Sequence, residues 1–156
     1  MANDPFEKAK NYAFLLLKYR PRSEKELAQR LKRKKFEEKI ILRTLSFLKE
    51  KKFIDDDYFA GAWIDSRLKR PLGLRRIRQE LLIKGVDKEI IERQLEEIRE
   101  DYYEADVVRG LAEKQFSRSK TVDLRKAKAR VYAYLMRRGF SAQAVINALN
   151  GLTEKS

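Results

Sequence analysis

The side chains that most often carry out catalysis or bind metals are missing from this sequence. It contains no histidine and no cysteine among its 156 residues, which excludes thiolate nucleophiles, disulfides, thiolate zinc sites and histidine general bases. Carboxylates, lysines and tyrosines remain, but the six glycines form neither a P-loop nor a GxGxxG motif. The composition therefore excludes most hydrolase and oxidoreductase mechanisms, and we expect no catalytic residue, no cofactor and no metal site.

One acidic cluster, Asp55-Asp56-Asp57, stands apart from this pattern. Three adjacent carboxylates could hold a hard cation such as Mg²⁺. They also precede a segment with helical periodicity, where a carboxylate can accept hydrogen bonds from free backbone N–H groups and favour the positive end of the helix. Capping is the commoner role at such a position, so we assign Asp55 and Asp56 to folding.

Positive charge dominates the rest of the chain. There are 37 Lys and Arg against 24 Asp and Glu, a net charge of +13, and the isoelectric point is near 9.9. Residues 1–54 have 16 basic and 7 acidic residues, residues 55–100 have 10 and 11, and residues 101–156 have 11 and 6. This uncompensated charge favours contact with phosphates or an acidic protein surface, over a long face more than in one catalytic pocket.

The candidate binding residues are basic positions that the helical pattern turns outward. On a helical wheel, Lys126, Arg130 and Arg137 fall on one side of their helix, away from Val131 and Leu135. Other basic residues gather at both ends of a helix in the first third of the chain and around a turn in the second. We select seven positions in all: Arg33, Arg70, Arg75, Arg76, Lys126, Arg130 and Arg137.

The elements that position these residues are helices from end to end. Apolar residues recur at intervals of three and four, strand-like alternation is missing, and the three prolines lie near the edges of the apolar runs. Ser23 and Glu26 have the spacing of a capping box, which predicts that a helix starts after Ser23. The expected helices are Phe6–Tyr19, Ser23–Lys34, Glu37–Lys51, Asp57–Lys69, Leu74–Lys84, Asp87–Glu100, Asp101–Ser117, Asp123–Arg138 and Ser141–Leu152.

The helices are organised as an internal repeat. If Phe36, Val86 and Phe140 are taken as equivalent, with offsets of 50 and 54 residues, the apolar positions of the three segments coincide. The matching sets are Leu27, Ile77 and Val131; Leu31, Leu81 and Leu135; Ile41, Ile91 and Val145; Leu45, Leu95 and Leu149; and Leu48, Ile98 and Leu152.

Glycine marks the end of the middle helix in two of the three segments. Gly85 and Gly139 precede Val86 and Phe140, whereas the first segment has Lys35 at this position. Glycine is favoured there because it adopts a positive φ without strain. We therefore expect an all-α chain of three three-helix repeats, at 1–54, 55–100 and 101–156. Such small units bury little surface alone, so we expect them to lean on their neighbours in an elongated, curved array.

Neither a membrane span nor an export signal is evident. The longest apolar run, Tyr12–Leu17, is far shorter than the ~20 residues that a span needs, and the N-terminus lacks a basic and an apolar region. We expect a soluble, cytoplasmic protein, and a monomer.

Several strings resemble the RecX family of recombinase regulators. In the first repeat these are Tyr12-Ala13, Leu16-Leu17, Arg20-Pro21-Arg22-Ser23-Glu24 and Glu26-Leu27. The central block is closer still, with Phe53-Ile54-Asp55-Asp56, Phe59-Ala60, Arg67, Gly73, Arg76-Ile77, Glu80-Leu81 and Lys84-Gly85-Val86. The third repeat is similar through Lys128, Tyr132, Leu135, Arg138-Gly139-Phe140 and Val145-Ile146. Lys35, where the family often has glycine, and Leu72 before Gly73 are small departures in the turns.

This resemblance covers Tyr12 to Leu152 and implies three tandem three-helix repeats. It also implies a non-enzymatic regulator of DNA repair and recombination, which binds the RecA filament on single-stranded DNA and inhibits its ATPase, strand exchange and growth. The seven basic positions are then expected to contact RecA or DNA, with weak, sequence-independent binding to DNA itself.

Two other interpretations of the residues stay open. Arginine-rich middle helices that follow a short turn are typical of helix-turn-helix transcription regulators, although Leu74–Lys84 offers only Gln79 and Arg75 toward base edges. Aromatic residues such as Tyr58 and Trp63 could stack on bases, but most of them have the spacing of core residues.

Overall fold

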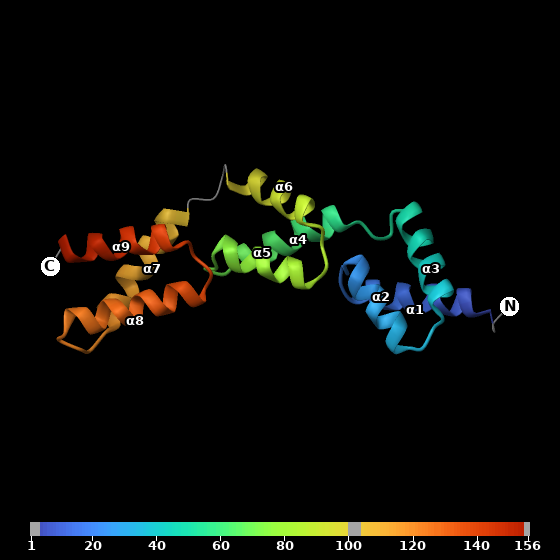
Figure 1. Ribbon diagram of the computed structural model, residues 1–156, viewed down its shortest axis with the longest axis horizontal. Coiled ribbons are helices and arrows are strands. Elements are labelled where there is room, and N and C mark those ends of the chain that lie inside the picture. Colours follow the sequence, from blue (N-terminus) through green and yellow to red (C-terminus); the bar gives the residue numbers. More distant parts are fainter. Residues whose placement is uncertain (1–3, 100–103, 155–156) are drawn as a thin grey trace. The chain divides into compact units, whose positions relative to one another are not determined.

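The chain is entirely helical in the part that the structure describes. This computed structural model describes residues 4–99 and 104–154, and within these ranges it contains nine α-helices and no strand (Figure 1). The helices are α1 (Pro5–Tyr19), α2 (Glu24–Arg33), α3 (Glu38–Glu50), α4 (Asp56–Leu68), α5 (Leu74–Ile83), α6 (Lys88–Arg99), α7 (Glu104–Arg118), α8 (Leu124–Arg137) and α9 (Ala142–Glu154). The expected elements are confirmed, except that residues 101–103 of the seventh expected helix and Glu100 of the sixth lie outside the described residues.

The apolar positions that define the repeat are the positions that the fold buries. Of the matched sets, only Phe36, Ile98 and Leu149 are partly exposed, and all the others are buried. Burial at the same register in successive segments is what three tandem three-helix repeats require, so this prediction is confirmed.

The middle helix of each repeat ends in the same way. Lys35, Gly85 and Gly139 have φ values of 68°, 81° and 87°. The N–H of the following residue reaches back to the carbonyl oxygen five positions earlier, at 3.2 Å from Phe36 to Leu31, 3.1 Å from Val86 to Leu81 and 3.4 Å from Phe140 to Leu135. This is the Schellman arrangement. The first repeat therefore keeps the turn despite its lysine.

The helices are grouped into two compact units. One runs as far as Trp63 and also includes Leu81–Gln94, and the other is made of Ile64–Glu80 and the residues from Leu95 onward. The division falls inside α4, α5 and α6, so the second repeat contributes helical segments to both units.

In the first unit, α1, α2 and α3 form a three-helix bundle (Figure 1). Its core consists of Ala9, Ala13, Leu16, Leu27, Leu31, Ile41, Leu45, Leu48 and Ile54. The predicted capping box is confirmed, because the Ser23 hydroxyl accepts from the Glu26 N–H at 3.2 Å and the Glu26 carboxylate accepts from the Ser23 N–H at 3.2 Å. Ser23 is fully buried, and its hydroxyl also donates to the Lys84 carbonyl at 2.7 Å. The start of α2 is thereby fixed against the end of α5.

In the second unit, α7 packs against α8 and α9 (Figure 1). The core contains Val108, Ala112, Val131, Leu135, Phe140, Val145, Ala148 and Leu152. Asp123 caps α8 by accepting from the N–H groups of Arg125 and Lys126 at 3.0 and 3.3 Å. None of the helices in the described ranges has the length and hydrophobicity that crossing a membrane demands.

Candidate anion-binding site

The site is built where the start of α5 meets the end of α8, within the second unit. The Gly73 N–H donates to the Arg138 carbonyl at 2.8 Å. A Cβ added to Gly73 would lie 2.2 Å from the Gly139 carbonyl group, and one added to Gly139 would lie 2.2 Å from Cβ of Arg76. Side chains larger than glycine would force these backbones apart. The two glycines therefore allow the close approach that brings Arg76 and Arg138 to one place.

Five arginines line a single cavity at this junction, which we call the arginine cavity. It has a volume of about 630 Å³, and no acidic residue lines it. The lining residues are Arg67, Arg70, Leu72, Arg76, Tyr134, Arg137 and Arg138. Three of the predicted positions, Arg70, Arg76 and Arg137, are thus brought together from α5, α8 and the turn between α4 and α5.

One carboxylate, on Glu80, binds arginines of this cavity. It holds Arg67 through two hydrogen bonds, of 2.9 Å from Nε and 2.7 Å from Nη2. Arg76 lies farther from it, with 3.8 Å between Arg76 Nε and Glu80 Oε2. Since one negative charge is divided between two guanidinium groups, the surroundings of the cavity keep a large positive excess.

The remaining arginines have no acidic partner within the described ranges. Arg138 lies over the Tyr134 ring, 4.8 Å from its centroid, and donates to the Pro71 carbonyl at 3.4 Å. Arg70 and Arg137 are exposed, and no ion pair joins either guanidinium to a carboxylate among the described side chains. Guanidinium groups bind phosphate and carboxylate oxygens in pairs through their planar fork of donors. The cavity is therefore suited to binding an anion.

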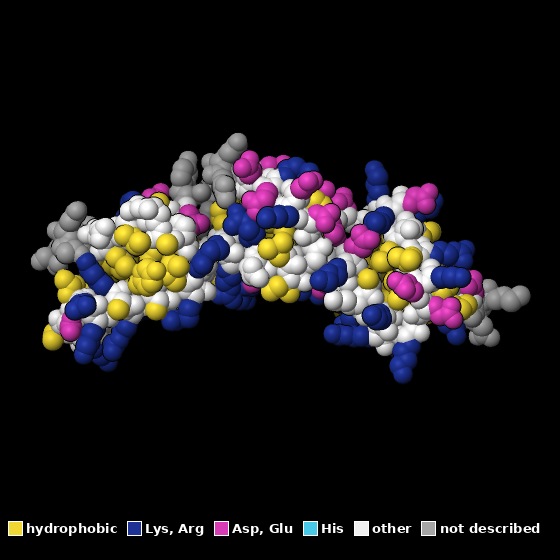
Figure 2. Space-filling view, in the orientation of Figure 1, with side chains coloured by type: hydrophobic (Ala, Val, Ile, Leu, Met, Phe, Trp, Pro, Cys, Tyr) yellow, Lys and Arg dark blue, Asp and Glu magenta, His cyan; other side chains and the backbone are white. Residues whose placement is uncertain are grey.

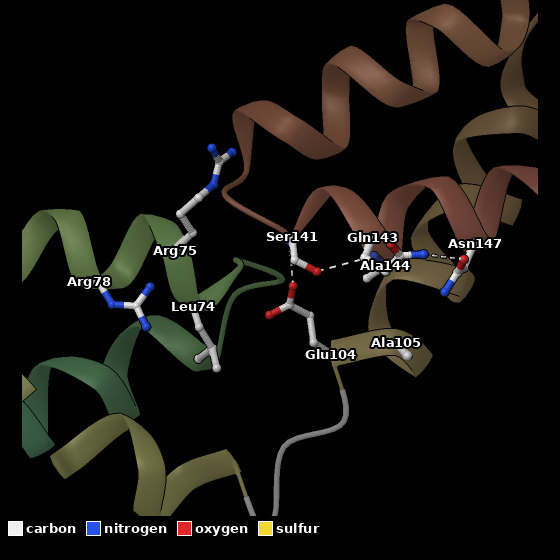
Figure 3. A pocket seen from close by; sticks show the side chains of 9 residues that line it. All are labelled: Leu74, Arg75, Arg78, Glu104, Ala105, Ser141, Gln143, Ala144 and Asn147. Carbon is white, nitrogen blue, oxygen red and sulfur yellow. Dashed lines mark hydrogen bonds between the residues drawn. The ribbon is translucent and has the colours of Figure 1, made fainter. Parts of the chain in front are cut away.

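Arg75 lies in a different cavity of the second unit (Figure 3). Its volume is about 530 Å³, and it is lined by Arg75 and Arg78 of α5, by Glu104 of α7 and by Ser141 just before α9. The Glu104 carboxylate accepts from the Ser141 N–H at 2.7 Å, and Arg75 donates to the Met136 carbonyl at 3.0 Å. The donors of this cavity are partly used within the fold.

The other predicted residues lie on separate stretches of surface. Lys126 and Arg130 are exposed on α8, along which Lys and Arg side chains gather (Figure 2). Arg130 lines a third cavity, of about 360 Å³, together with Arg118 and Lys120. Arg33 is exposed in the last turn of α2, in the first unit. These residues extend the basic surface but do not join the arginine cavity.

Arg67, Arg138 and Tyr134 also line the arginine cavity, although the helical pattern does not place them among the predicted positions. Arg138 is the residue before Gly139, so its place at the end of α8 was visible in the repeat. Only the three-dimensional contact between Gly73 and Arg138 shows that the end of α8 faces the start of α5. The missing signal is therefore a tertiary one.

The acidic cluster has structural partners in the first unit. The Asp55 carboxylate accepts from the Asp57 N–H at 2.9 Å, and Asp56 accepts from the Glu24 N–H at the start of α2, at 3.0 Å. Burial, followed by the negative charges of Glu24, Asp87 and Asp55, raises the pKa of Asp56 against the effect of this hydrogen bond. Asp57 pairs with Arg93. Both Asp55 and Asp56 thus accept hydrogen bonds at helix starts, and no group of acidic residues in the described part of the chain is arranged to hold a metal ion.

Comparison with protein families matches almost the whole chain. Models of the first, second and third three-helix domains of RecX match residues 9–48, 55–95 and 101–149. The regulatory protein RecX of Caldanaerobacter subterraneus subsp. tengcongensis is 36% identical over 144 residues, which are 92% of this chain and 70% of that protein. The regulatory protein RecX of Chlorobium phaeobacteroides is 36% identical over 151 residues, or 96% and 97% of the two chains.

Two solved structures have the same fold. The crystal structure of RecX from Lactobacillus salivarius matches with a TM-score of 0.84 at 24% identity, over 96% of this chain and 97% of that one. A second crystal structure, of a regulatory protein RecX, matches with a TM-score of 0.83 at 24% identity, over 96% and 75%. The repeats, the shared register of their cores and the family matches agree, and the chain belongs to the RecX family of regulatory proteins.

Proposed function

We propose that this chain regulates homologous recombination by binding the RecA filament on single-stranded DNA, and that it inhibits ATP hydrolysis, strand exchange and filament growth there. It acts by occupancy and not by chemistry, as a monomer in the cytoplasm. Each three-helix repeat, at 1–54, 55–100 and 101–156, supplies part of the binding surface.

The arginine cavity is the observation that carries this proposal. It combines five guanidinium groups in one cavity, and among the described side chains the Glu80 carboxylate pairs with two of them. A nucleoprotein filament presents both phosphates and acidic side chains, and either can use such donors. Further exposed cations on α2 and α8 add contacts that a long filament can meet simultaneously, which raises affinity through multivalency.

The test is a RecA ATPase assay on single-stranded DNA with increasing amounts of this protein. We expect inhibition at amounts near or below that of RecA. Adding excess free single-stranded DNA after the filament has assembled is the control, because loss of inhibition would then reveal simple sequestration of DNA. ATP hydrolysis that stays unchanged at saturating protein would contradict the proposal.

Footprinting separates this function from operator recognition. A helix-turn-helix regulator protects a defined duplex sequence, whereas we expect this protein to protect none. A reproducible protected site would favour the transcription regulator.

A further inference from the structure

The repeat places two junctions of the same kind in the molecule, one in each unit. In the first unit, the start of α2 meets the end of α5 through the bond from Ser23 to the Lys84 carbonyl. In the second unit, the start of α5 meets the end of α8 through the bond from Gly73 to the Arg138 carbonyl. The offsets of 50 and 54 residues make Gly73 equivalent to Ser23 and Arg138 equivalent to Lys84. The charged residues of the two junctions can therefore be compared position by position.

At the first junction, Glu26 neutralises the nearby positive charges. Its carboxylate accepts from Arg20 at 3.3 and 2.5 Å and from Lys84 at 3.3 Å, in addition to the Ser23 N–H. Burial by itself would raise the pKa of Glu26, but the hydrogen bonds from Arg20 and Ser23 and the charges of Arg20 and Lys84 outweigh it, so the pKa lies below the usual glutamate range. The cations of the first junction, Arg20 and Lys84, are thus paired with a carboxylate of the chain itself.

The second junction has the same two cations and a third in place of the anion. Arg70 is equivalent to Arg20 and Arg138 to Lys84, but the position of Glu26 is occupied by Arg76. Moreover, Arg76 lies in the first turn of α5, where that helix has no acidic residue and where the helix dipole disfavours a cation. The charge arrangement of this junction thus opposes local stability, as is typical of functional sites.

We propose that the arginine cavity binds a backbone phosphate of single-stranded DNA, which takes the place that the Glu26 carboxylate has in the first junction. The phosphate accepts hydrogen bonds from Arg70, Arg76 and Arg137, and Arg138 adds its charge from over the Tyr134 ring. This inference rests on the proposed function, because it identifies which component of the filament the cavity meets.

A phosphate strand fits the cavity better than a protein carboxylate does. Consecutive phosphates of one strand supply several negative charges from a single ligand, whereas a protein must bring separate acidic side chains to match five arginines. The volume of about 630 Å³ also lies in the range of roughly 300 to 1,000 Å³ that is usual for small-molecule sites, so it can admit a nucleotide and not only a carboxylate group.

The test compares two double variants that lose the same charge in the same unit. Arg70→Gln with Arg137→Gln removes two cavity cations that have no acidic partner in the described part of the chain. Arg109→Gln with Lys114→Gln removes two exposed cations of α7 and is the control. Binding to a fluorescein-labelled oligothymidine is measured by anisotropy over a range of salt concentrations, circular dichroism confirms folding, and the RecA ATPase assay is run in parallel.

We expect the cavity variant to bind DNA about tenfold more weakly or worse, which corresponds to the loss of at least one charge-assisted hydrogen bond. The slope of log K against log salt should become shallower by about 0.7 for each phosphate that the variant no longer neutralises, and the control should keep most of the affinity and slope. Equal affinities and slopes for the two variants would overturn the inference.

The ATPase assay separates this inference from the proposed function. If the wild type inhibits RecA and the cavity variant fails to inhibit while binding DNA as the control does, the cavity meets an acidic surface of RecA, and the assignment to DNA is wrong. If the wild type binds DNA through the cavity but does not inhibit RecA, the proposed function fails and the phosphate site stands.

Discussion

The two junctions between middle helices share a hydrogen bond to the carbonyl at a helix end and differ in their charges. In each, a residue just before one helix donates to a carbonyl at the end of another, at 2.7 Å from Ser23 and at 2.8 Å from Gly73. The first junction also has a capping box and an ion-paired group of Arg20, Glu26 and Lys84. The second junction has no acidic residue in the first turn of α5, and five arginines line its cavity.

The difference indicates that the fold and the proposed phosphate site depend on different residues of the same repeat. Each junction is held by a hydrogen bond to a carbonyl at the end of the neighbouring helix, from the Ser23 hydroxyl in the first and from the Gly73 N–H in the second. The charged residue at the third position of the helix is therefore free to vary. In the first repeat this position carries Glu26 and stabilises the helix start. In the second it carries Arg76 and forgoes that stabilisation, which leaves positive charge for a ligand.

The largest loss of stability is expected from disrupting the backbone contact of the second junction. Gly139→Ala should cost more than about 3 kcal/mol, since it combines an unfavourable positive φ with overpacking against the Arg76 backbone. Gly85→Ala should cost less, about 2 kcal/mol or more, because the added methyl meets side-chain atoms of Lys25, of which Cδ can move away but Cβ, at 2.5 Å, can move only with its backbone. Urea unfolding measures both. Equal losses would mean that the two junctions are packed alike.

The next largest effect on stability is expected from the ion-paired group of the first junction. Glu26→Gln should cost about 1 to 3 kcal/mol at neutral pH, because it weakens the bonds to Arg20 and Lys84. The folded pKa of Glu26 is lower than the unfolded one, so its contribution is complete above the unfolded pKa of about 4.3 and is lost as the pH falls through the folded pKa.

The stability difference between wild type and Glu26→Gln should therefore shrink in acid. Unfolding curves at a series of pH values measure it. Glu50→Gln, which changes an exposed residue at the end of α3, is the control and should stay within about 0.5 kcal/mol of the wild type. A difference that is independent of pH would argue against the ion-paired state of Glu26.

The smallest effect is expected where the first repeat departs from the glycine pattern. Lys35 has a φ of 68°, which disfavours a side chain, so Lys35→Gly should stabilise the first unit by up to about 1 kcal/mol after the greater flexibility of glycine in the unfolded chain is counted. Lys34→Gly is a matched control, since Lys34 has a φ of −76° and should lose about 0.5 to 1 kcal/mol instead. Thermal unfolding distinguishes the opposite signs.

Much of the fold could be predicted because periodicity and capping are local signals. The recurrence of Leu27, Ile77 and Val131 at one register, and the spacing of Ser23 and Glu26, depend only on neighbouring residues and on helix geometry. The turn at Lys35 is the instructive exception. Its sequence lacks the glycine, yet its Schellman bonds hold a lysine at positive φ, because the contacts of the repeat outweigh the local preference.

The site could be predicted only in part, because charge and exposure do not show which cations converge. The helical pattern predicts Arg70, Arg76 and Arg137 as outward basic positions, and these three share the arginine cavity. Arg75 is adjacent to Arg76 in sequence but lies in another cavity. The difference arises from the contact of α5 with the end of α8, which is a tertiary fact that no helical wheel contains.

The most direct test of the account is the exchange of charge at the second junction, with and without DNA. Thermal unfolding of wild type, Arg76→Glu and the control Arg109→Glu is measured in the absence and presence of saturating oligothymidine at low salt. We expect Arg76→Glu to unfold at or above the wild-type temperature without DNA, because the introduced carboxylate would pair with Arg70 and Arg138 as Glu26 pairs with Arg20 and Lys84.

DNA should raise the unfolding temperature of the wild type and of the control, since a ligand stabilises the state that binds it. It should raise the unfolding temperature of Arg76→Glu only a little. The account would be contradicted if Arg76→Glu unfolded at a clearly lower temperature than the wild type without DNA. It would also be contradicted if DNA raised the unfolding temperature of Arg76→Glu as much as that of the wild type.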